Sequence, residues 1–206
     1  TGHFAYFAEE IMKRDYAAAM TFFVFIIFFL FGAFISNFLS ELVSKKHPNL
    51  HHVIPISIEI TILIGVAIFG VQTELGSNEG KWVASSMLFA MGMQNALVTK
   101  ISKSTVRTTH LTGLFTDLGI ELSQLFFYKK PEERKRLKKS IYLRLSIIAF
   151  FFIGCISGGF IYNALQLKTL FVAATFLLIA LLYDYIRLSF FVIKRKAIFK
   201  KAILNK

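Results

Sequence analysis

The sequence predicts an all-α fold, a polytopic bundle of transmembrane helices, and three observations support this. The 206 residues are 55% hydrophobic, and the apolar residues form long runs rather than alternating with polar ones. Lys and Arg are distributed very unevenly between the segments that connect these runs. Two parts of the chain also share a repeated pattern of residues. Together these features indicate a protein that crosses the membrane several times, so we expect the lipid bilayer to be a partner.

Five apolar runs are long enough to form transmembrane helices. The hydrocarbon core of a bilayer is about 30 Å thick, and a helix of about 20 apolar residues crosses it. We therefore expect five visible spans, at Ala17–Leu39, Val53–Thr73, Trp82–Val98, Leu145–Leu165 and Leu170–Val192.

A repeated motif relates the two halves of the chain. Thr1-Gly2-His3-Phe4 recurs 111 residues later as Thr112-Gly113-Leu114-Phe115, and Glu10 recurs as Glu121. A Phe-rich apolar span with an internal glycine follows each copy. These features predict that the chain arose by duplication.

The second copy is longer than the first. The glycines inside the two Phe-rich spans, Gly32 and Gly154, are 122 residues apart rather than 111. The later copy therefore carries about eleven extra residues, which we assign to a basic loop, Lys129–Lys139.

The helix at Trp82–Val98 precedes the second Thr-Gly motif and has no counterpart before the first. We expect a single membrane domain, residues 1–206, in which residues 1–79 form a first repeat without its opening helix. Residues 80–206 then form the second repeat. The full chain would contain three plus three spans, of which five are visible here.

The positions of the cations predict the orientation of the spans. If the spans alternate in direction, one side of the membrane holds four Lys and Arg and the other holds twenty. Cytoplasmic loops are the ones rich in Lys and Arg, so we expect a cytoplasmic C-terminus. Ala17–Leu39 and Leu145–Leu165 then run in opposite directions. Inverted repeats are typical of many secondary transporters, although duplication has also built channels and scaffolds.

A net charge of +12 would suggest nucleic-acid binding in a soluble protein. Such a role needs a basic domain that exposes aromatic side chains, whereas the aromatics of this chain lie in its apolar spans. The basic cluster Lys129–Lys139 instead suits anionic lipid headgroups. We expect no nucleic-acid partner.

The segment from Lys100 to Tyr128 is too polar to cross the membrane simply. After Gly113 it has a helical pattern, with leucines on one face and carboxylates and an amide on the next: Leu114, Leu118, Leu122 and Leu125, then Asp117, Glu121 and Gln124. The segment either dips into the membrane and returns, or forms an amphipathic interfacial helix with a Thr cap. A Thr-Gly pair that opens a helix can also hold an anion.

Polar side chains inside the predicted spans are candidate functional groups. Gln94 and Asn95 follow Gly92 and need hydrogen-bond partners in hydrocarbon, either from a bound ligand or from a neighbouring helix. Asp184 has Arg187 three residues later, which predicts a structural ion pair. Glu59 has no cation one turn away, so it is the candidate group for coupling to a proton or another cation.

Catalytic and metal sites are not predicted. His47, His51 and His52 share a loop without a carboxylate or cysteine at metal-ligand spacing, so we expect exposed histidines and no metal. Cys155 is interpreted as a packing residue. Motifs of intramembrane proteases and of zinc proteases are missing, which predicts a protein that is not an enzyme and needs no cofactor.

Two motifs carry a resemblance to a known family. Ala90-Met91-Gly92-Met93-Gln94-Asn95-Ala96, followed by Arg107-Thr108-Thr109-His110-Leu111-Thr112-Gly113, resembles the signature of the YoaK family. The resemblance covers essentially the whole chain. It implies a six-span protein of the bacterial inner (cytoplasmic) membrane whose activity is not established. The family's first helix ends in Thr-Gly-Asn, whereas this chain has Thr1-Gly2-His3.

The leading functional prediction is secondary transport of a small solute. The predicted binding residues are Thr1, Gly2, Gln94, Asn95, Thr112, Gly113 and Glu121, with Glu59 as the coupling group. The alternative is a membrane scaffold or regulator that engages lipid or a cytoplasmic partner through its basic cluster. A homo-oligomer is compatible with either prediction.

Overall fold

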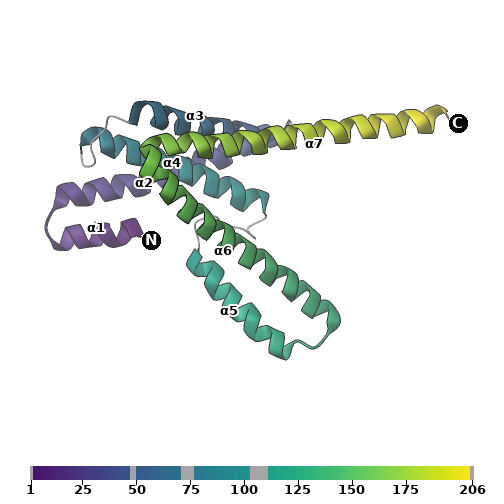
Figure 1. The fold of residues 1–206 in the computed structure, drawn as a ribbon, viewed down its shortest axis with the longest axis horizontal. Helices are drawn as coiled ribbons and strands as arrows, with labels where there is room; N and C mark the ends of the chain where they lie inside the picture. The colour runs from purple at the N-terminus through teal and green to yellow at the C-terminus, as the bar shows by residue number, and fades with distance from the viewer. Residues whose placement is uncertain (1, 47–49, 71–76, 103–110, 205–206) are drawn as a thin grey trace. The chain divides into compact units, whose positions relative to one another are not determined.

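The computed structural model describes residues 2–46, 50–70, 77–102 and 111–204, with side chains described as far as Arg187. Every regular element in these ranges is a helix, which confirms the all-α prediction (Figure 1). The elements are α1 (Gly2–Met12), α2 (Tyr16–Ser44), α3 (Val53–Phe69), α4 (Asn78–Ile101), α5 (Leu111–Phe127), α6 (Pro131–Leu165), the 3₁₀ turn η2 (Gln166–Thr169) and α7 (Leu170–Leu204).

The five predicted spans fall on α2, α3, α4, α6 and α7, although residues 71–73 of the second span lie outside the described residues. Two described stretches are long and apolar enough to cross a membrane, Tyr16–Ser44 and Pro131–Arg187. The second joins α6 through η2 to the start of α7. A membrane protein is therefore supported by length and composition, while the complete bundle and its inverted repeats stay predictions.

The chain forms two compact units, which are described separately. One contains residues 1–97 and 167–206, and the other contains residues 98–166. In the first unit α7 packs along α3 (Figure 1). The two units are defined by which residues contact each other in space. The predicted division into residues 1–79 and 80–206 is defined by the sequence repeat, and it stays a prediction.

A tight turn joins α1 to α2. Arg14 adopts a left-handed conformation with φ 62°, and the backbone N–H of Asp15 donates to the carbonyl of Glu10 at 3.0 Å. The N–H of Arg14 donates to the carbonyl of Ile11, also at 3.0 Å. This pair of bonds is a Schellman motif, which satisfies the last carbonyls of α1. Asp15 then caps α2 by accepting from the N–H of Ala18.

Aromatic rings hold α1 against α2. Tyr6 stacks on Phe22 with ring centroids 5.4 Å apart, and His3 packs edge-on against Phe25 at 5.8 Å. Phe7 and Phe23 form a third contact at 5.9 Å. Such rings contribute large apolar surface with a defined geometry, so the first hairpin closes through aromatic packing.

In the second unit α5 and α6 form a longer hairpin (Figure 1). Its core consists of Leu114, Leu118, Ile141 and Ile148, all less than a tenth exposed. Leu114 and Leu118 confirm the predicted apolar face of α5, and Leu125 packs partly against it. Leu122 lies one turn after Leu118 on the same helix but is 44% exposed, so it does not belong to the buried core of the hairpin.

The expectation of a basic loop at Lys129–Lys139 was also wrong, because α6 begins at Pro131. Met12, the last residue of α1, corresponds to position 123 when the 111-residue offset between the two Thr-Gly motifs is applied, but α5 continues to Phe127. Tyr16, the first residue of α2, corresponds to position 138 when the 122-residue offset between Gly32 and Gly154 is applied, but α6 begins seven residues earlier, at Pro131. On the predicted repeat, the eleven extra residues lengthen α5 by four and α6 by seven, and the turn keeps three residues.

Glycines bring α2 and α4 into close contact within the first unit. A Cβ added at Gly32 would overlap the backbone carbonyl oxygen of Phe89, and one added at Gly92 would overlap that of Phe29. Both glycines are buried. Small residues allow helix backbones to approach in this way in membranes, so these two positions define the crossing point.

Candidate functional site

A charged network lies between α5 and α6, centred on Arg144. Its Nε donates to Glu121 Oε2 at 3.0 Å, and its Nη1 donates to Asp117 Oδ2 at 2.8 Å. Ser140 Oγ donates to the other carboxylate oxygen, Glu121 Oε1, at 2.6 Å. The side chains of Arg144 and Glu121 are only 18% and 14% exposed. Both oxygens of Glu121 are therefore engaged inside the hairpin, in a charge-assisted network that is mostly shielded from solvent.

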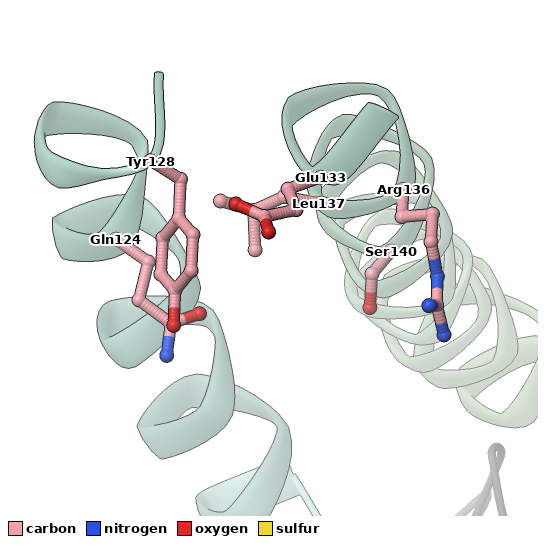
Figure 2. Close-up of a pocket in the computed structure, with 6 residues that line it drawn as sticks. All are labelled: Gln124, Tyr128, Glu133, Arg136, Leu137 and Ser140. Carbon is pink, nitrogen blue, oxygen red and sulfur yellow. The ribbon is translucent and has the colours of Figure 1, made fainter. Parts of the chain in front are cut away.

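A pocket of about 510 Å³ lies next to this network and shares Ser140 with it. Figure 2 shows Gln124 and Tyr128 of α5 facing Glu133 and Leu137 of α6, whereas Arg136 extends on the side of α6 away from α5. The lining thus combines a guanidinium, a carboxylate, an amide and two hydroxyls with one apolar side chain. Such a mixture can bind a charged, hydrogen-bonding group.

Glu59 is the only charged residue buried in the described core. It lies in the apolar helix α3, and its exposure is 5%. Within the described residues, no hydrogen bond or ion pair is made by its carboxylate. An uncompensated carboxylate at such a position is costly, so a group of this kind is a functional candidate by default.

Asp184 on α7 pairs with His52, the residue that precedes α3. The atoms Nε2 of His52 and Oδ2 of Asp184 are 2.8 Å apart, and the histidine side chain is 13% exposed. His52 is therefore not the exposed loop histidine that the sequence suggested. Within the described residues Asp184 contacts His52, and an ion pair of Asp184 with Arg187 is not found. The contact joins the first unit's α3 and α7.

The predicted amides lie on α4, next to its crossing with α2. Gln94 and Asn95 are half-buried, and Asn95 has an interaction partner in the structure. The neighbouring Gly92 is explained by backbone packing against α2, so ligand approach is not needed to account for it.

Gly2 and Gly113 both lie in the first turn of a helix. Gly2 is the exposed first residue of α1, and Thr1 lies outside the described residues. Thr112 and Gly113 lie in the first turn of α5, where the carbonyl of Thr112 accepts from the hydroxyl of Thr116. The two segments belong to different units, so their meeting at one binding site stays a prediction.

The sequence argument missed Arg144, Ser140 and His52 as partners. A signal for Arg144 was present, because Asp117 and Glu121 lie one turn apart on one helical face and require a nearby cation. Arg144 is the cation that immediately precedes the apolar part of α6. No comparable local signal pointed to His52, since its partner lies on a helix distant in sequence.

The chain matches a known protein family. The model of a protein family described as "Protein of unknown function (DUF1275)" matches residues 1–183. No curated protein and no solved structure matches the chain. A function for the chain therefore rests on its fold and its polar clusters.

Proposed function

The chain belongs to the DUF1275 family, whose function is unknown, and from this premise we propose that it is a secondary transporter of a small solute. The proposed location is the bacterial inner membrane, with several spans and a cytoplasmic C-terminus. Membership of DUF1275 is consistent with the predicted resemblance to the YoaK family, which stays part of this proposal.

The observation that carries the proposal is the buried Glu59, which has no partner among the residues that the structure describes. On insertion scales, a carboxylate at the centre of a membrane helix costs about 2.5–3.5 kcal/mol. Groups retained at that cost pair with a cation, face a cavity or carry protons. Among the described residues Glu59 has no cationic partner, which favours a role in binding and releasing a proton or another cation.

A second buried polar group belongs to a helix that packs against α3. Ser36 on α2 has no exposed surface, and in the described part of the chain its Oγ has no hydrogen-bond partner. Buried hydroxyls normally have partners, because leaving one unpaired costs about 1–3 kcal/mol. A passing water or solute would supply the missing bond. This supports a polar path through the helices of the first unit.

Transport is tested by reconstituting the full chain in proteoliposomes and measuring uptake of a solute panel under an imposed pH or sodium gradient. We expect uptake of at least one solute, which depends on the gradient and is lost in Glu59→Gln. Glu79→Gln is the matched control, because Glu79 is an exposed carboxylate in the first turn of α4. Gln94→Ala tests the proposed solute site separately.

Two outcomes would contradict the proposal at different levels. Full gradient-dependent uptake in Glu59→Gln would remove the coupling role while leaving transport in place. A wild-type chain that moves no solute would instead favour the scaffold alternative. The helical, basic α5–α6 hairpin is the observation that supports this alternative, since its exposed cations can contact lipid or a partner.

A further inference from the structure

A groove of about 280 Å³ lies between α2 and α4 in the first unit. The two helices run in the same direction (Figure 1), and the groove lies near the beginning of both, before the glycine contacts at which they cross. Helices that cross at one point separate on either side of it, which leaves this space. The lining of this α2–α4 groove includes Met20, Val24, Phe25, Asn78, Lys81 and Trp82.

The walls of the α2–α4 groove are apolar and partly exposed. Met20 is 59% exposed, and Trp82 is 65% exposed. Because α2 is long and apolar enough to cross a membrane, side chains exposed on it contact acyl chains rather than water. The two hydroxyls of the lining do not change this, since each donates to a carbonyl of its own helix, Thr21 at 3.1 Å and Ser85 at 2.8 Å. The groove therefore provides a surface for an acyl chain.

Lys81 gives the rim of the groove a positive charge. It is exposed, and it forms no ion pair with the described residues. Glu79 is not part of the lining, because residues two positions apart do not share a helix face. Asn78 adds an amide at the first residue of α4, where the helix dipole is also positive. The rim therefore favours an anion.

Trp82 places this rim at the boundary between hydrocarbon and water. Tryptophan is enriched at that boundary, and lysine side chains near helix ends extend their ammonium groups toward it. The Trp82 ring packs edge-on against Phe28 of α2, with centroids 6.1 Å apart, and most of it stays exposed. An occupant of the groove would have its charge in the interface and its apolar part beside Trp82.

The volume of the groove indicates that it holds part of a molecule. Sites that enclose a whole small ligand occupy about 300–1,000 Å³, whereas this groove is smaller and has exposed walls. A phospholipid meets these requirements, since its phosphate accepts hydrogen bonds from an ammonium and an amide while its acyl chain continues into the bilayer. A covering apolar helix would leave Lys81 without an anion.

We propose that the α2–α4 groove binds one anionic phospholipid from the surrounding leaflet. The phosphate accepts from Lys81 and Asn78, and the upper part of one acyl chain lies against Met20, Val24 and Trp82. In the predicted orientation this end faces the outer side of the membrane, which holds four Lys and Arg. General attraction of anionic lipid is therefore weak there, and a preference near Trp82 is attributable to Lys81. The proposal does not depend on transport activity.

Trp82 is the single tryptophan of the chain, so its fluorescence reports on this groove. The full chain is reconstituted in equimolar phosphatidylglycerol and phosphatidylcholine with acyl chains of the same length. One preparation contains brominated phosphatidylglycerol and the other brominated phosphatidylcholine, so the surface charge is equal and bromine quenches the tryptophan that it contacts. We expect stronger quenching by brominated phosphatidylglycerol, corresponding to about a fivefold preference for the anionic lipid, which one lysine supplies.

Matched variants assign this preference to the groove. Lys81→Gln should reduce it to less than about twofold, whereas Lys168→Gln removes a cation from the same predicted side outside the groove and should change it less than about twofold. Val24→Phe narrows the groove and should lower the contact of the anionic lipid with Trp82, whereas Ile27→Phe, about one turn later on α2, should not. Far-ultraviolet circular dichroism verifies that each variant remains helical.

Three outcomes would overturn the assignment. Equal quenching by the two brominated lipids would show an ordinary lipid contact without selection for charge. Equal effects of Lys81→Gln and Lys168→Gln would show general electrostatic attraction. No quenching by either lipid would show that another helix or a second copy of the chain covers Trp82.

Discussion

His52 and Asp184 connect the start of α3 to α7 through a contact of 2.8 Å between Nε2 and Oδ2. The two helices also pack along each other, so the contact fixes their relative position along the shared axis. A polar contact in a mostly apolar interface specifies register more strictly than apolar packing, which tolerates sliding by a helical turn.

The first prediction concerns this contact. His52→Ala and Asp184→Asn should each lower stability in detergent, and the double variant should lose less than the sum, with a coupling of about 0.5–1.5 kcal/mol. Arg187→Gln is the control and should have little effect, since the described contact of Asp184 is with His52. Chemical unfolding monitored by circular dichroism measures these differences. Strong coupling of Asp184 to Arg187 instead would restore the partner that the sequence suggested.

The second prediction ranks the two carboxylates that Arg144 binds. Glu121 is 14% exposed, and Asp117 is 51% exposed. Glu121→Gln should therefore cost roughly 1.5–3 kcal/mol, because it weakens a shielded charge-assisted network. Asp117→Asn should cost less than about 1 kcal/mol, as for exposed ion pairs. Thermal unfolding of both variants measures the order, and a larger loss for Asp117→Asn would contradict the described network.

The third prediction concerns the crossing of α2 and α4. Gly32→Ala and Gly92→Ala should each destabilise the protein by roughly 1–3 kcal/mol, because the new methyl group would overlap a backbone carbonyl that cannot rotate away. Gly65→Ala on α3 is the control, since a Cβ there meets nothing within 4 Å. It should be neutral or stabilising by up to about 1 kcal/mol. Equal effects at Gly32, Gly92 and Gly65 would contradict the close crossing.

The fourth prediction concerns the turn between α1 and α2. Arg14 holds φ 62°, which costs a non-glycine residue about 1–2 kcal/mol. Arg14→Gly should relieve this strain and leave stability equal or slightly higher, whereas the β-branched Arg14→Val should lower it by at least about 1 kcal/mol. Differential scanning fluorimetry of the two variants tests the order. A more stable Arg14→Val would exclude the left-handed conformation.

The helices could be predicted from the sequence because long apolar runs have few alternatives in a membrane protein. The start of α6 was missed because the charged residues after Tyr128 were interpreted as a loop. Charge is equally compatible with an exposed helix. Pro131 at the first position, followed by Glu132 and Glu133 in the first turn, is in fact a typical helix start.

The polar contacts were harder to predict because they join residues far apart in sequence. Asp117 and Glu121 were correctly placed on one face of α5, but the sequence does not state which helix supplies their cation. The contact of His52 with Asp184 requires knowledge that α3 and α7 are neighbours. The spacing of apolar residues predicts one helix at a time, whereas the residue that contacts a given polar side chain depends on how the helices pack.

The lengths of the two helix extensions explain why the hairpin accepted them. Four and seven residues are close to one and two complete helical turns, since an α-helix has 3.6 residues per turn. Each extension therefore returns its helix to nearly the same rotation, as the heptad spacing does in coiled coils. Leu137, Ile141 and Ile148 are spaced by these same intervals and face the same seam. Removing residues 124–127 together with 131–137 would rotate α5 by only about 40° and α6 by only about 20°, so the hairpin can change length while nearly the same helix faces meet.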